Sequence, residues 1–169
     1  EKLYVSRSNL PSHHGLLVGE KSLEKNLEKE GYTVIHPEKL SIEEQLHYYA
    51  NAKQLIFADG SAFHLYVLVA NQLQNVFIVW RRKPHGTFAL QYKTFTNKPL
   101  NDTPHIAGYF QLPNEEFNSA RQKAVINIET LSDELCELGF IQKVWRREKG
   151  VESETNNYRG QGYVFTKHI

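Results

Sequence analysis

The sequence has a single cysteine, no methionine and no long hydrophobic run. Cys136 cannot form an internal disulfide, and no second Cys or His stands at metal-ligand spacing from it. A disulfide framework and a cysteine zinc site are therefore excluded, and we expect a reducing, cytoplasmic compartment. No apolar segment approaches the roughly 20 residues that a membrane span needs, and no signal peptide is visible.

The chain also lacks an excess of charge of either sign. Its 20 Lys and Arg residues stand against 19 Asp and Glu residues, which leaves a formal charge of +1. This balance gives no reason to expect a nucleic-acid partner. With 169 residues, 40% of them hydrophobic, the chain is long enough to bury one core. Because it has no methionine and Glu1 directly precedes a strand-like run, we expect it to be part of a longer protein.

Short β-rich segments alternate with helical segments over the first eighty residues. The predicted strands are 3–5, 32–35, 55–57 and 76–80. The helices predicted between them cover about 20–30, 41–52 and 61–71, with a capping box formed by Ser41 and Glu44. The strands are apolar without polar alternation, which is typical of a sheet covered on both faces. The pattern predicts a doubly wound α/β fold with a parallel sheet.

The regularity fades after Trp80. Residues 81–114 contain four of the six prolines and predict loops with one short helix near 88–95. Apolar residues three or four apart then predict one long helix over 115–138. The remaining segments are predicted as a strand over 140–145, a polar hairpin over 146–162 and a partner strand over 163–166.

Ligands of doubly wound sheets bind beyond the carboxyl ends of the strands. The predicted strands end at Arg7, at Glu38, at the Gly60-Ser61 turn and at Arg81. Glycine allows a ligand to approach the backbone closely, and the start of the following helix attracts anions such as phosphate. Arg7 or Arg81 could grip the same anion through two hydrogen bonds. A tight turn without function is the alternative interpretation.

Several motifs in this half of the chain occur in a characteristic order. They are Lys2–Ser8, Gly19-Glu20, Gly31–Glu38, Ser41–Gln45 and Asp59–His64. In this order they resemble the catalytic region of glycosyltransferase family 61, which includes bacterial capsular-polysaccharide enzymes. The resemblance covers about residues 2–80. It implies the Rossmann-like, nucleotide-sugar-binding, carboxyl-terminal half of a two-lobed GT-B glycosyltransferase.

The resemblance also implies roles for individual residues. The residues implied to bind the donor are Arg7 at the diphosphate, Glu38 and Gln45 around the nucleoside, and Gly60, Ser61 and Ala62 as a phosphate cradle. Arg81 lies beyond the matching residues and is a further candidate for the diphosphate because its predicted strand ends at the same edge. Asp59 replaces the histidine of the family's more familiar His-Gly-Ala turn. Asp59 or His64 is therefore the candidate for the catalytic role of that histidine.

The resulting hypothesis is an inverting glycosyltransferase of capsular or surface polysaccharide synthesis. Its donor would be a nucleotide sugar, with UDP favoured, and its acceptor a glycan, and neither a metal nor another cofactor is expected. Residues 1–112 would form the donor lobe, and 113–169 a helix and extension packed on it. The acceptor lobe and any peripheral membrane association would belong to a region before Glu1, so the fragment alone is expected to be inactive.

Other interpretations remain open. The domain could bind nucleotide without catalysis, or serve as an α/β protein-interaction domain. A receiver domain is disfavoured because the first strand ends in Ser6-Arg7 instead of an acidic pair. His64 could be a core histidine and Gln45 a solvated residue of a first helical turn. His13 and His14 lack a third ligand at usable spacing for a metal site.

Overall fold

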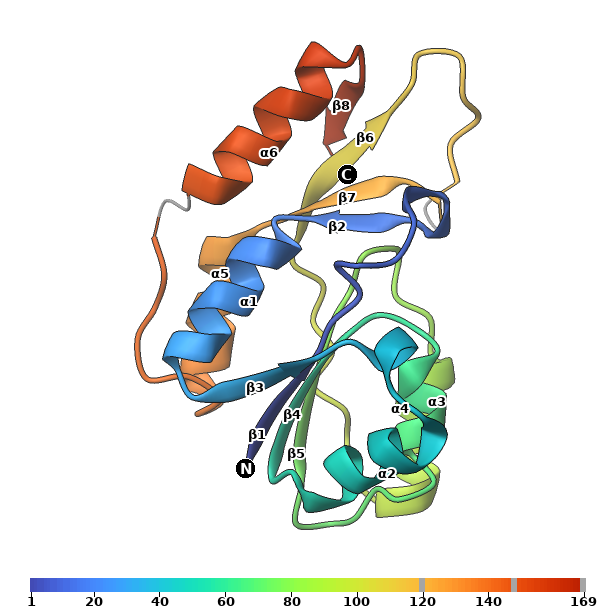
Figure 1. The fold of residues 1–169 in the computed structure, drawn as a ribbon, viewed down its shortest axis with the longest axis vertical. Coiled ribbons are helices and arrows are strands. Elements are labelled where there is room, and N and C mark those ends of the chain that lie inside the picture. The colour runs from blue at the N-terminus through green and yellow to red at the C-terminus, as the bar shows by residue number, and fades with distance from the viewer. Residues whose placement is uncertain (119–120, 147–148, 168–169) are drawn as a thin grey trace.

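A computed structural model describes residues 1–118, 121–146 and 149–167 and contains two four-stranded sheets (Figure 1). Sheet A is parallel, with the strand order β3-β1-β4-β5. Its strands are β1 (Lys2–Val5), β3 (Tyr32–Ile35), β4 (Gln54–Ala58) and β5 (Asn75–Val79). The predicted α/β fold with a parallel sheet is confirmed.

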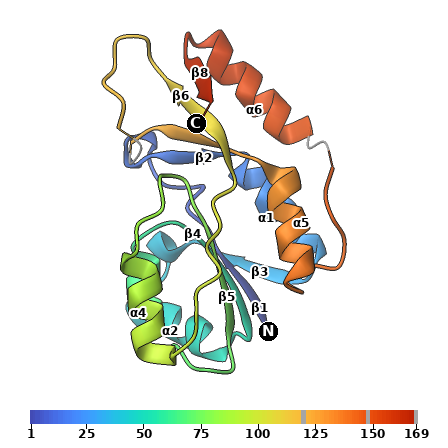
Figure 2. The same ribbon diagram turned by 180° about the vertical axis from the view of Figure 1, so that it is seen from behind.

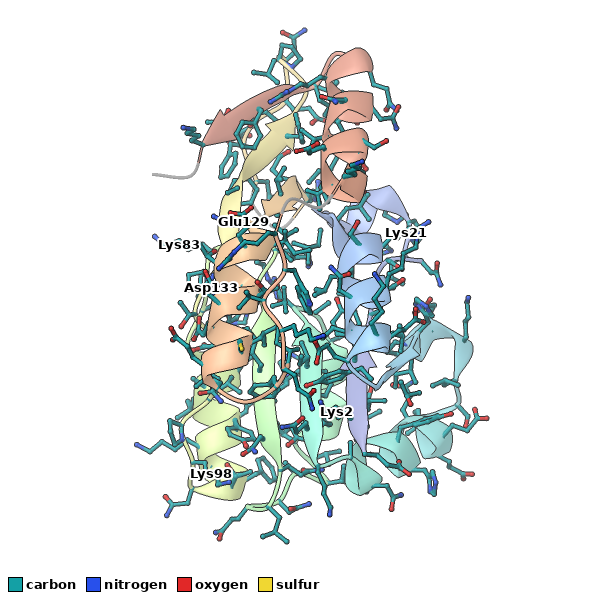
Figure 3. All side chains as sticks on the ribbon, turned by 90° about the vertical axis from the view of Figure 1, so that its left-hand side faces the viewer. Lys2, Lys21, Lys83, Lys98, Glu129 and Asp133 are labelled. Carbon is teal, nitrogen blue, oxygen red and sulfur yellow. The ribbon has the colours of Figure 1, made fainter. Side chains whose placement is uncertain are left out.

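Helices cover both faces of sheet A. On one face lie α1 (Glu20–Lys29) and α5 (Ile128–Glu137), and on the other α2 (Ile42–Asn51), α3 (Ala62–Tyr66) and α4 (Thr87–Thr96) (Figure 1). A hydrophobic core lies on each face of sheet A, and successive strand residues point into opposite cores. Tyr4 packs with the leucines of α1 and α5, and Val5 packs with the aromatic residues of α2 to α4. Figure 3 shows α1 and α5 side by side, with Lys21 and Glu129 on their outer sides.

Sheet B lies beyond the carboxyl ends of sheet A (Figure 1). Its strand order is β2-β7-β6-β8, with β2 parallel to β7 and the other pairs antiparallel. The strands are β2 (Leu16–Val18), β7 (Lys123–Ile126), β6 (Ile106–Gln111) and β8 (Val164–Lys167), and α6 (Lys149–Gly160) packs beside them. The short helix η1 (Ser12–His14) precedes β2, so the connection from β1 to α1 passes through sheet B.

The segment after α4 protects the open edge of sheet A. Figure 2 shows it running along β5. The backbone N–H of Ile78 donates to the carbonyl of Asn101, and Trp80 Nε1 donates to the carbonyl of Asp102. These contacts occupy an edge that would otherwise offer free hydrogen-bonding groups.

The prediction of a single long helix over 115–138 is wrong. Within the described part, this range contains β7 and then α5; residues 119–120 lie outside it. Asn127 begins α5 by accepting the N–H of Thr130. The apolar spacing led to the wrong prediction because it fits a strand as well as a helix. In the structure Ala124, Ile126 and Ile128 all face one core.

Other predictions for the second half also need correction. The segment 140–145 is not a strand, and 149–160 forms α6 instead of a hairpin arm, while residues 147–148 lie outside the description. The predicted last strand exists as β8, but it pairs with β6, which was not predicted. Likewise β2 was missed, and the helix predicted over 61–71 ends at Tyr66.

A substitution at Gln74 measures how much buried side-chain hydrogen bonds contribute to the stability of sheet A. Its side chain is 2% exposed; Nε2 donates to the carbonyls of Tyr49 and Ala52, and Oε1 accepts from Tyr66 Oη and the N–H of Asn71. We expect Gln74→Leu to lower the free energy of unfolding by about 2–4 kcal/mol, because buried partners lose their hydrogen bonds. Urea denaturation measures the change.

The matched control is Gln161→Leu, at an exposed glutamine whose side chain, among the described residues, forms a hydrogen bond only with Asn157. It should change the free energy of unfolding by less than about 0.5 kcal/mol. An equally small effect at Gln74 would show that its hydrogen bonds do not stabilise the fold.

Candidate functional site

The carboxyl ends of three strands meet at one pocket. Val5 is in register with Ile35 on β3 and with Phe57 on β4, so the residues that follow these strands gather at one edge of sheet A. The pocket there has a volume of about 390 Å³, within the range of small-molecule sites. Its described lining is Val5, Ser6, Arg7, Leu10, Pro37, Glu38, Ile42, Gln45, Ala58, Gly60, Ser61, Ala62 and Leu65. We call this the rim pocket.

The rim pocket has one polar and one apolar side. Arg7, Gly60 and Ser61 supply cationic and backbone groups, and Leu10, Pro37, Ile42 and Leu65 supply an apolar wall. Ile42 is 63% exposed although it is a large apolar residue, which marks this wall as accessible. Such a surface can take an aromatic base or another flat apolar group, while the polar side can take an anion.

Arg7 lies directly over Gly60. A Cβ atom added to Gly60 would come within 2.6 Å of Arg7 Nη1 and 2.9 Å of Cδ, so only glycine leaves room for this side chain. Arg7 Nη2 donates to the carbonyl of His14, but its buried Nε finds no hydrogen-bond partner in residues 1–118, 121–146 and 149–167. Among the described residues, no carboxylate lies within ion-pair distance of Arg7. Burial lowers the pKa of Arg7, and Asp59 and Glu20 oppose that shift.

The other two arginines near this edge are held by Asp59. Arg82 donates two hydrogen bonds to the Asp59 carboxylate, 2.8 Å from Nε to Oδ2 and 3.0 Å from Nη2 to Oδ1. Arg81 Nε donates to the Asp59 carbonyl and lies 3.8 Å from Oδ2. Burial lowers the pKa of Arg81 to about 10, with Asp59 opposing the shift. Asp59 is fully buried, and neither it nor Arg81 lines the rim pocket.

A buried glutamate joins the end of β1 to the start of α1. Glu20 is 3% exposed, and its Oε1 accepts from Tyr4 Oη (2.9 Å), Ser6 Oγ (3.1 Å) and the N–H of Arg7 (2.8 Å). Burial raises its pKa to about 7, although these hydrogen bonds favour the ionised form. Glu20 was noted in the sequence only through its motif, and its burial could not be read there because the strand it contacts is remote along the chain.

The structure also explains why a glycine precedes Glu20. Gly19 has φ +95°, and a Cβ there would lie 2.7 Å from Ile126 Cγ2. Its N–H donates to Glu154 on α6 at 2.8 Å. The Gly19-Glu20 pair, where the resembling family has Asn-Glu, thus fits the close packing of β7 and α6 against this turn.

Glu38 and Gln45 approach the rim pocket from the β3 side. Glu38 belongs to the short helix η2 (Pro37–Lys39) and is the one carboxylate in the described lining. Gln45 Nε2 donates to the carbonyls of Pro37 and Leu40, and its Oε1 accepts from Tyr49 Oη. Gln45 therefore holds the η2 turn in place, which gives this first-turn residue a structural task in addition to lining the pocket.

The Gly60 turn leads into a helix of only five residues, which is shorter than predicted. A helix of this length contributes little dipole, so the cationic character of the pocket depends mainly on Arg7. Ser61 and Ala62 line the pocket beside Gly60. The predicted donor-binding set is thus brought together except for Arg81.

His64 lies outside the rim pocket. Its side chain is exposed, and Nδ1 lies 2.7 Å from Gln91 Oε1 on α4. It is therefore not the core histidine of the alternative interpretation. The catalytic roles predicted for Asp59 and His64 stay predictions.

The described residues form neither a metal centre nor a membrane-spanning helix. In 1–118, 121–146 and 149–167 no group of three or more His, Cys, Asp or Glu side chains is arranged to hold a metal ion. In the same ranges, every helix is too short or too polar to cross a bilayer.

Comparison with known proteins agrees with the motifs of the first half. The sequence profile of the family described as Glycosyltransferase 61 matches residues 1–76, somewhat less than half of the chain. The match supports a relationship to this family and, in general terms, glycosyltransferase activity. No curated protein matches the chain significantly. The matched range contains every residue of the rim pocket.

The raised pKa of Glu20 predicts a pH dependence of stability. Between the ordinary pKa of 4.5 and about 7, the folded protein keeps a proton that the unfolded chain has released. The free energy of unfolding should therefore fall by about 3 kcal/mol as pH rises through this window, and then level off. Glu20→Gln keeps an acceptor oxygen but cannot ionise, so this contribution should vanish. Urea denaturation of both proteins from pH 4.5 to 8 measures it.

Glu28→Gln removes one exposed carboxylate of the same helix and controls for the change of net charge. It should retain the wild-type slope. Parallel stability curves for wild type and Glu20→Gln would contradict the assignment of this slope to Glu20.

Proposed function

We propose that this chain is the donor-binding domain of a family 61-type glycosyltransferase. The rim pocket would bind a nucleoside diphosphate sugar, with the diphosphate at Arg7 and the Gly60–Ala62 turn and the nucleoside against the apolar wall near Ile42. The family match over residues 1–76 and the fit of the pocket to a small molecule both support this.

The observation that carries the proposal is the state of Arg7. Its Nε is buried at the edge of the rim pocket without a partner in the described part of the chain, whereas Asp59 binds Arg82 and contacts Arg81. A guanidinium without a carboxylate gains strong charge-assisted hydrogen bonds from a phosphate. Gly60 admits this side chain to the turn, so anion binding explains both residues.

Arg7 would act on the leaving group during transfer. When the bond between the sugar and the diphosphate breaks, negative charge grows on the departing diphosphate, and a fixed guanidinium stabilises it. We further propose an inverting reaction, in which a base removes the proton of the acceptor hydroxyl. Asp59 is an unfavourable base where it stands, because both of its oxygens accept from Arg82.

The wider setting follows from the family resemblance and is also a proposal. The acceptor would be a glycan of capsular or surface polysaccharide synthesis, the donor a UDP sugar and the compartment the cytoplasm. No metal is required in this scheme, because Arg7 and backbone N–H groups would stabilise the negative charge of the diphosphate through hydrogen bonds.

A nucleotide-binding domain without transfer activity is the second candidate. Two placements favour it: Asp59 is engaged by Arg82, and His64 points to Gln91 outside the rim pocket. A longer protein containing this chain would distinguish the two. Release of nucleoside diphosphate that depends on an acceptor glycan would support the enzyme, and nucleotide binding without release would support the second candidate.

Nucleotide binding tests the pocket directly. We expect UDP or a UDP sugar to raise the melting temperature in the presence of EDTA, because a ligand of the native state stabilises it by mass action. Arg7→Ala should raise the dissociation constant at least tenfold. The reason is that the variant loses hydrogen bonds to a charged group, which contribute about 1.5–3 kcal/mol. Isothermal titration calorimetry gives the constants, with GDP and CMP as alternative ligands.

Gly60→Ala supplies an independent variant. Its methyl group must displace the Arg7 side chain, so affinity should fall as in Arg7→Ala while the fold is kept. Gly86→Ala is the matched control, since a Cβ at Gly86 meets no atom within 4 Å. Unchanged affinity in both Arg7→Ala and Gly60→Ala would refute nucleotide binding at the rim pocket.

A further inference from the structure

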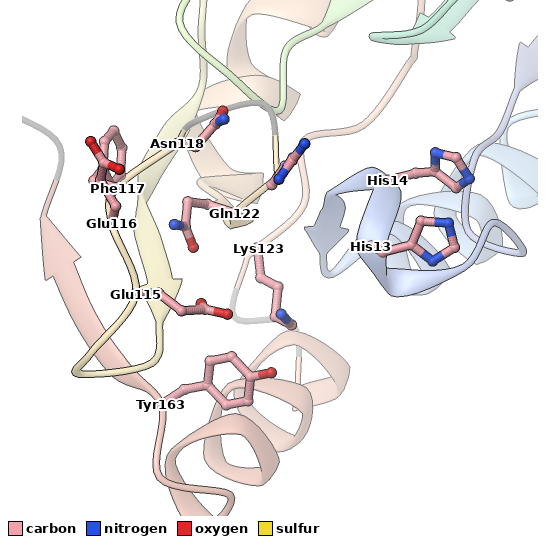
Figure 4. Close-up of a pocket in the computed structure, with 10 residues that line it drawn as sticks. His13, His14, Glu115, Glu116, Phe117, Asn118, Gln122, Lys123 and Tyr163 are labelled. Atoms are coloured by element: carbon pink, nitrogen blue, oxygen red, sulfur yellow. The ribbon is translucent and has the colours of Figure 1, made fainter.

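Glu38 reaches the rim pocket with uncommitted carboxylate oxygens. Its side chain is 30% exposed and accepts no hydrogen bond within the described part of the chain; His36 Nδ1, at 4.0 Å from Glu38 Oε1, is too far away for one. Glu115 is different. It borders a larger pocket of about 1300 Å³ beside sheet B, where Lys123 also lies (Figure 4), and its carboxylate accepts the N–H of Leu112 at 3.4 Å. The oxygens of Glu38 are therefore available to donors on a ligand.

The topology of sheet A gives Glu38 a characteristic position. β3 is the second strand of this sheet along the chain, it pairs with β1, and Glu38 follows it in η2. In nucleotide-binding doubly wound sheets, an acidic residue at a comparable place, beyond the first crossover, accepts a hydrogen bond from the ribose. The position of Glu38 thus fits recognition of a ribose.

Within the rim pocket, Glu38 lies between the cationic side and the apolar wall. Burial lowers the pKa of Arg7, and the charge of Glu38 is among those that oppose this shift, so the two groups interact. On its other side Glu38 follows Pro37, which belongs to the apolar wall. In a nucleoside diphosphate the ribose joins the diphosphate to the base. With the diphosphate at Arg7 and the base near Ile42, the ribose therefore lies beside Glu38.

The other polar side chain on this side of the pocket has no donor left. Both N–H groups of Gln45 Nε2 are taken by the carbonyls of Pro37 and Leu40, and its Oε1 accepts from Tyr49 Oη. Glu38 and Gln45 together thus offer acceptors and no free side-chain donor. A ribose matches this arrangement, because its two neighbouring hydroxyl groups can donate to the two oxygens of one carboxylate.

We propose that Glu38 is a specificity-determining residue, which accepts hydrogen bonds from the 2′ and 3′ hydroxyl groups of the donor ribose. The inference rests on the proposed function and narrows the donor to ribonucleoside diphosphate sugars. A 2′-deoxynucleotide leaves one oxygen of Glu38 desolvated without a partner, which is costly for a charged group. A phosphate at either hydroxyl would face the negative charge of Glu38.

Three nucleotides that share a base and a diphosphate test this assignment. They are UDP, 2′-deoxy-UDP and 2′,3′-dideoxy-UDP, measured by isothermal titration calorimetry in EDTA. We expect the wild type to bind UDP at least about tenfold more tightly than dideoxy-UDP, with 2′-deoxy-UDP between them. In Glu38→Ala the ratio of the UDP and dideoxy-UDP dissociation constants should shrink to less than about twofold. This ratio does not depend on the fraction of the variant that is folded.

Glu43→Ala is the matched control. It removes an exposed carboxylate from the first turn of α2, which lies outside the described lining of the rim pocket, and it changes the net charge equally. The control should keep the wild-type ratio. A general effect of charge near the pocket would instead change the ratio alike in both variants, which would contradict the role of Glu38.

The outcomes separate this inference from the proposed function. Arg7-dependent binding of UDP and dideoxy-UDP with equal affinity overturns the inference alone, as does a preference for UDP that Glu38→Ala retains. Guanine also carries two neighbouring N–H donors. A preference for GDP over UDP that disappears in Glu38→Ala, with no effect of the ribose hydroxyl groups, would therefore assign Glu38 to the base and overturn the inference. If no nucleotide binds, the proposed function fails and the inference fails with it.

Discussion

The buried carboxylate of Glu20 determines how the chain leaves the first strand. Its Oε1 accepts hydrogen bonds from a tyrosine hydroxyl, a serine hydroxyl and the backbone N–H of Arg7. Because Glu20 also begins α1, the contact fixes this helix against the end of β1 even though η1 and β2 intervene in the sequence. The N–H bond fixes the backbone of Arg7, and from there its guanidinium reaches over Gly60.

A second carboxylate decides which arginine is available. Three arginines lie near the carboxyl edge of sheet A, and one of them, Arg82, takes both oxygens of Asp59. Arg81 is buried against the same residue. Asp59 thus reduces the positive charge near the rim pocket and leaves Arg7 as its principal cation. Removing one partner of such a buried pair is strongly destabilising. Asp59 therefore supports the structure around the rim pocket without lining it.

The sequence predicted sheet A and the composition of the rim pocket for the same reason. Apolar strands alternate there with capped helices, and local signals such as Ser41 with Glu44 are satisfied as expected. Parallel strands bring their ends together, so listing those ends recovered Arg7, Glu38 and Gly60. Arg81 was the exception, because a residue that follows a strand can turn inward, and the carbonyl of Asp59 that holds it belongs to the neighbouring strand end.

The second half could not be predicted in the same way. Sheet B joins β2 to strands more than eighty residues away, and its four strands are short. Apolar residues two apart in β7 continue into α5 without a glycine or proline, so the spacing matched a helix. Only the pairing of β7 with β2 and β6 resolves that ambiguity, and pairing partners leave no local trace.

Sheet B gives the first crossover a role beyond connecting β1 to α1. The excursion through η1 and β2 places the backbone carbonyl of His14 3.4 Å from Arg7 Nη2. Any movement of η1 on ligand binding would therefore reach the guanidinium directly, through one hydrogen bond.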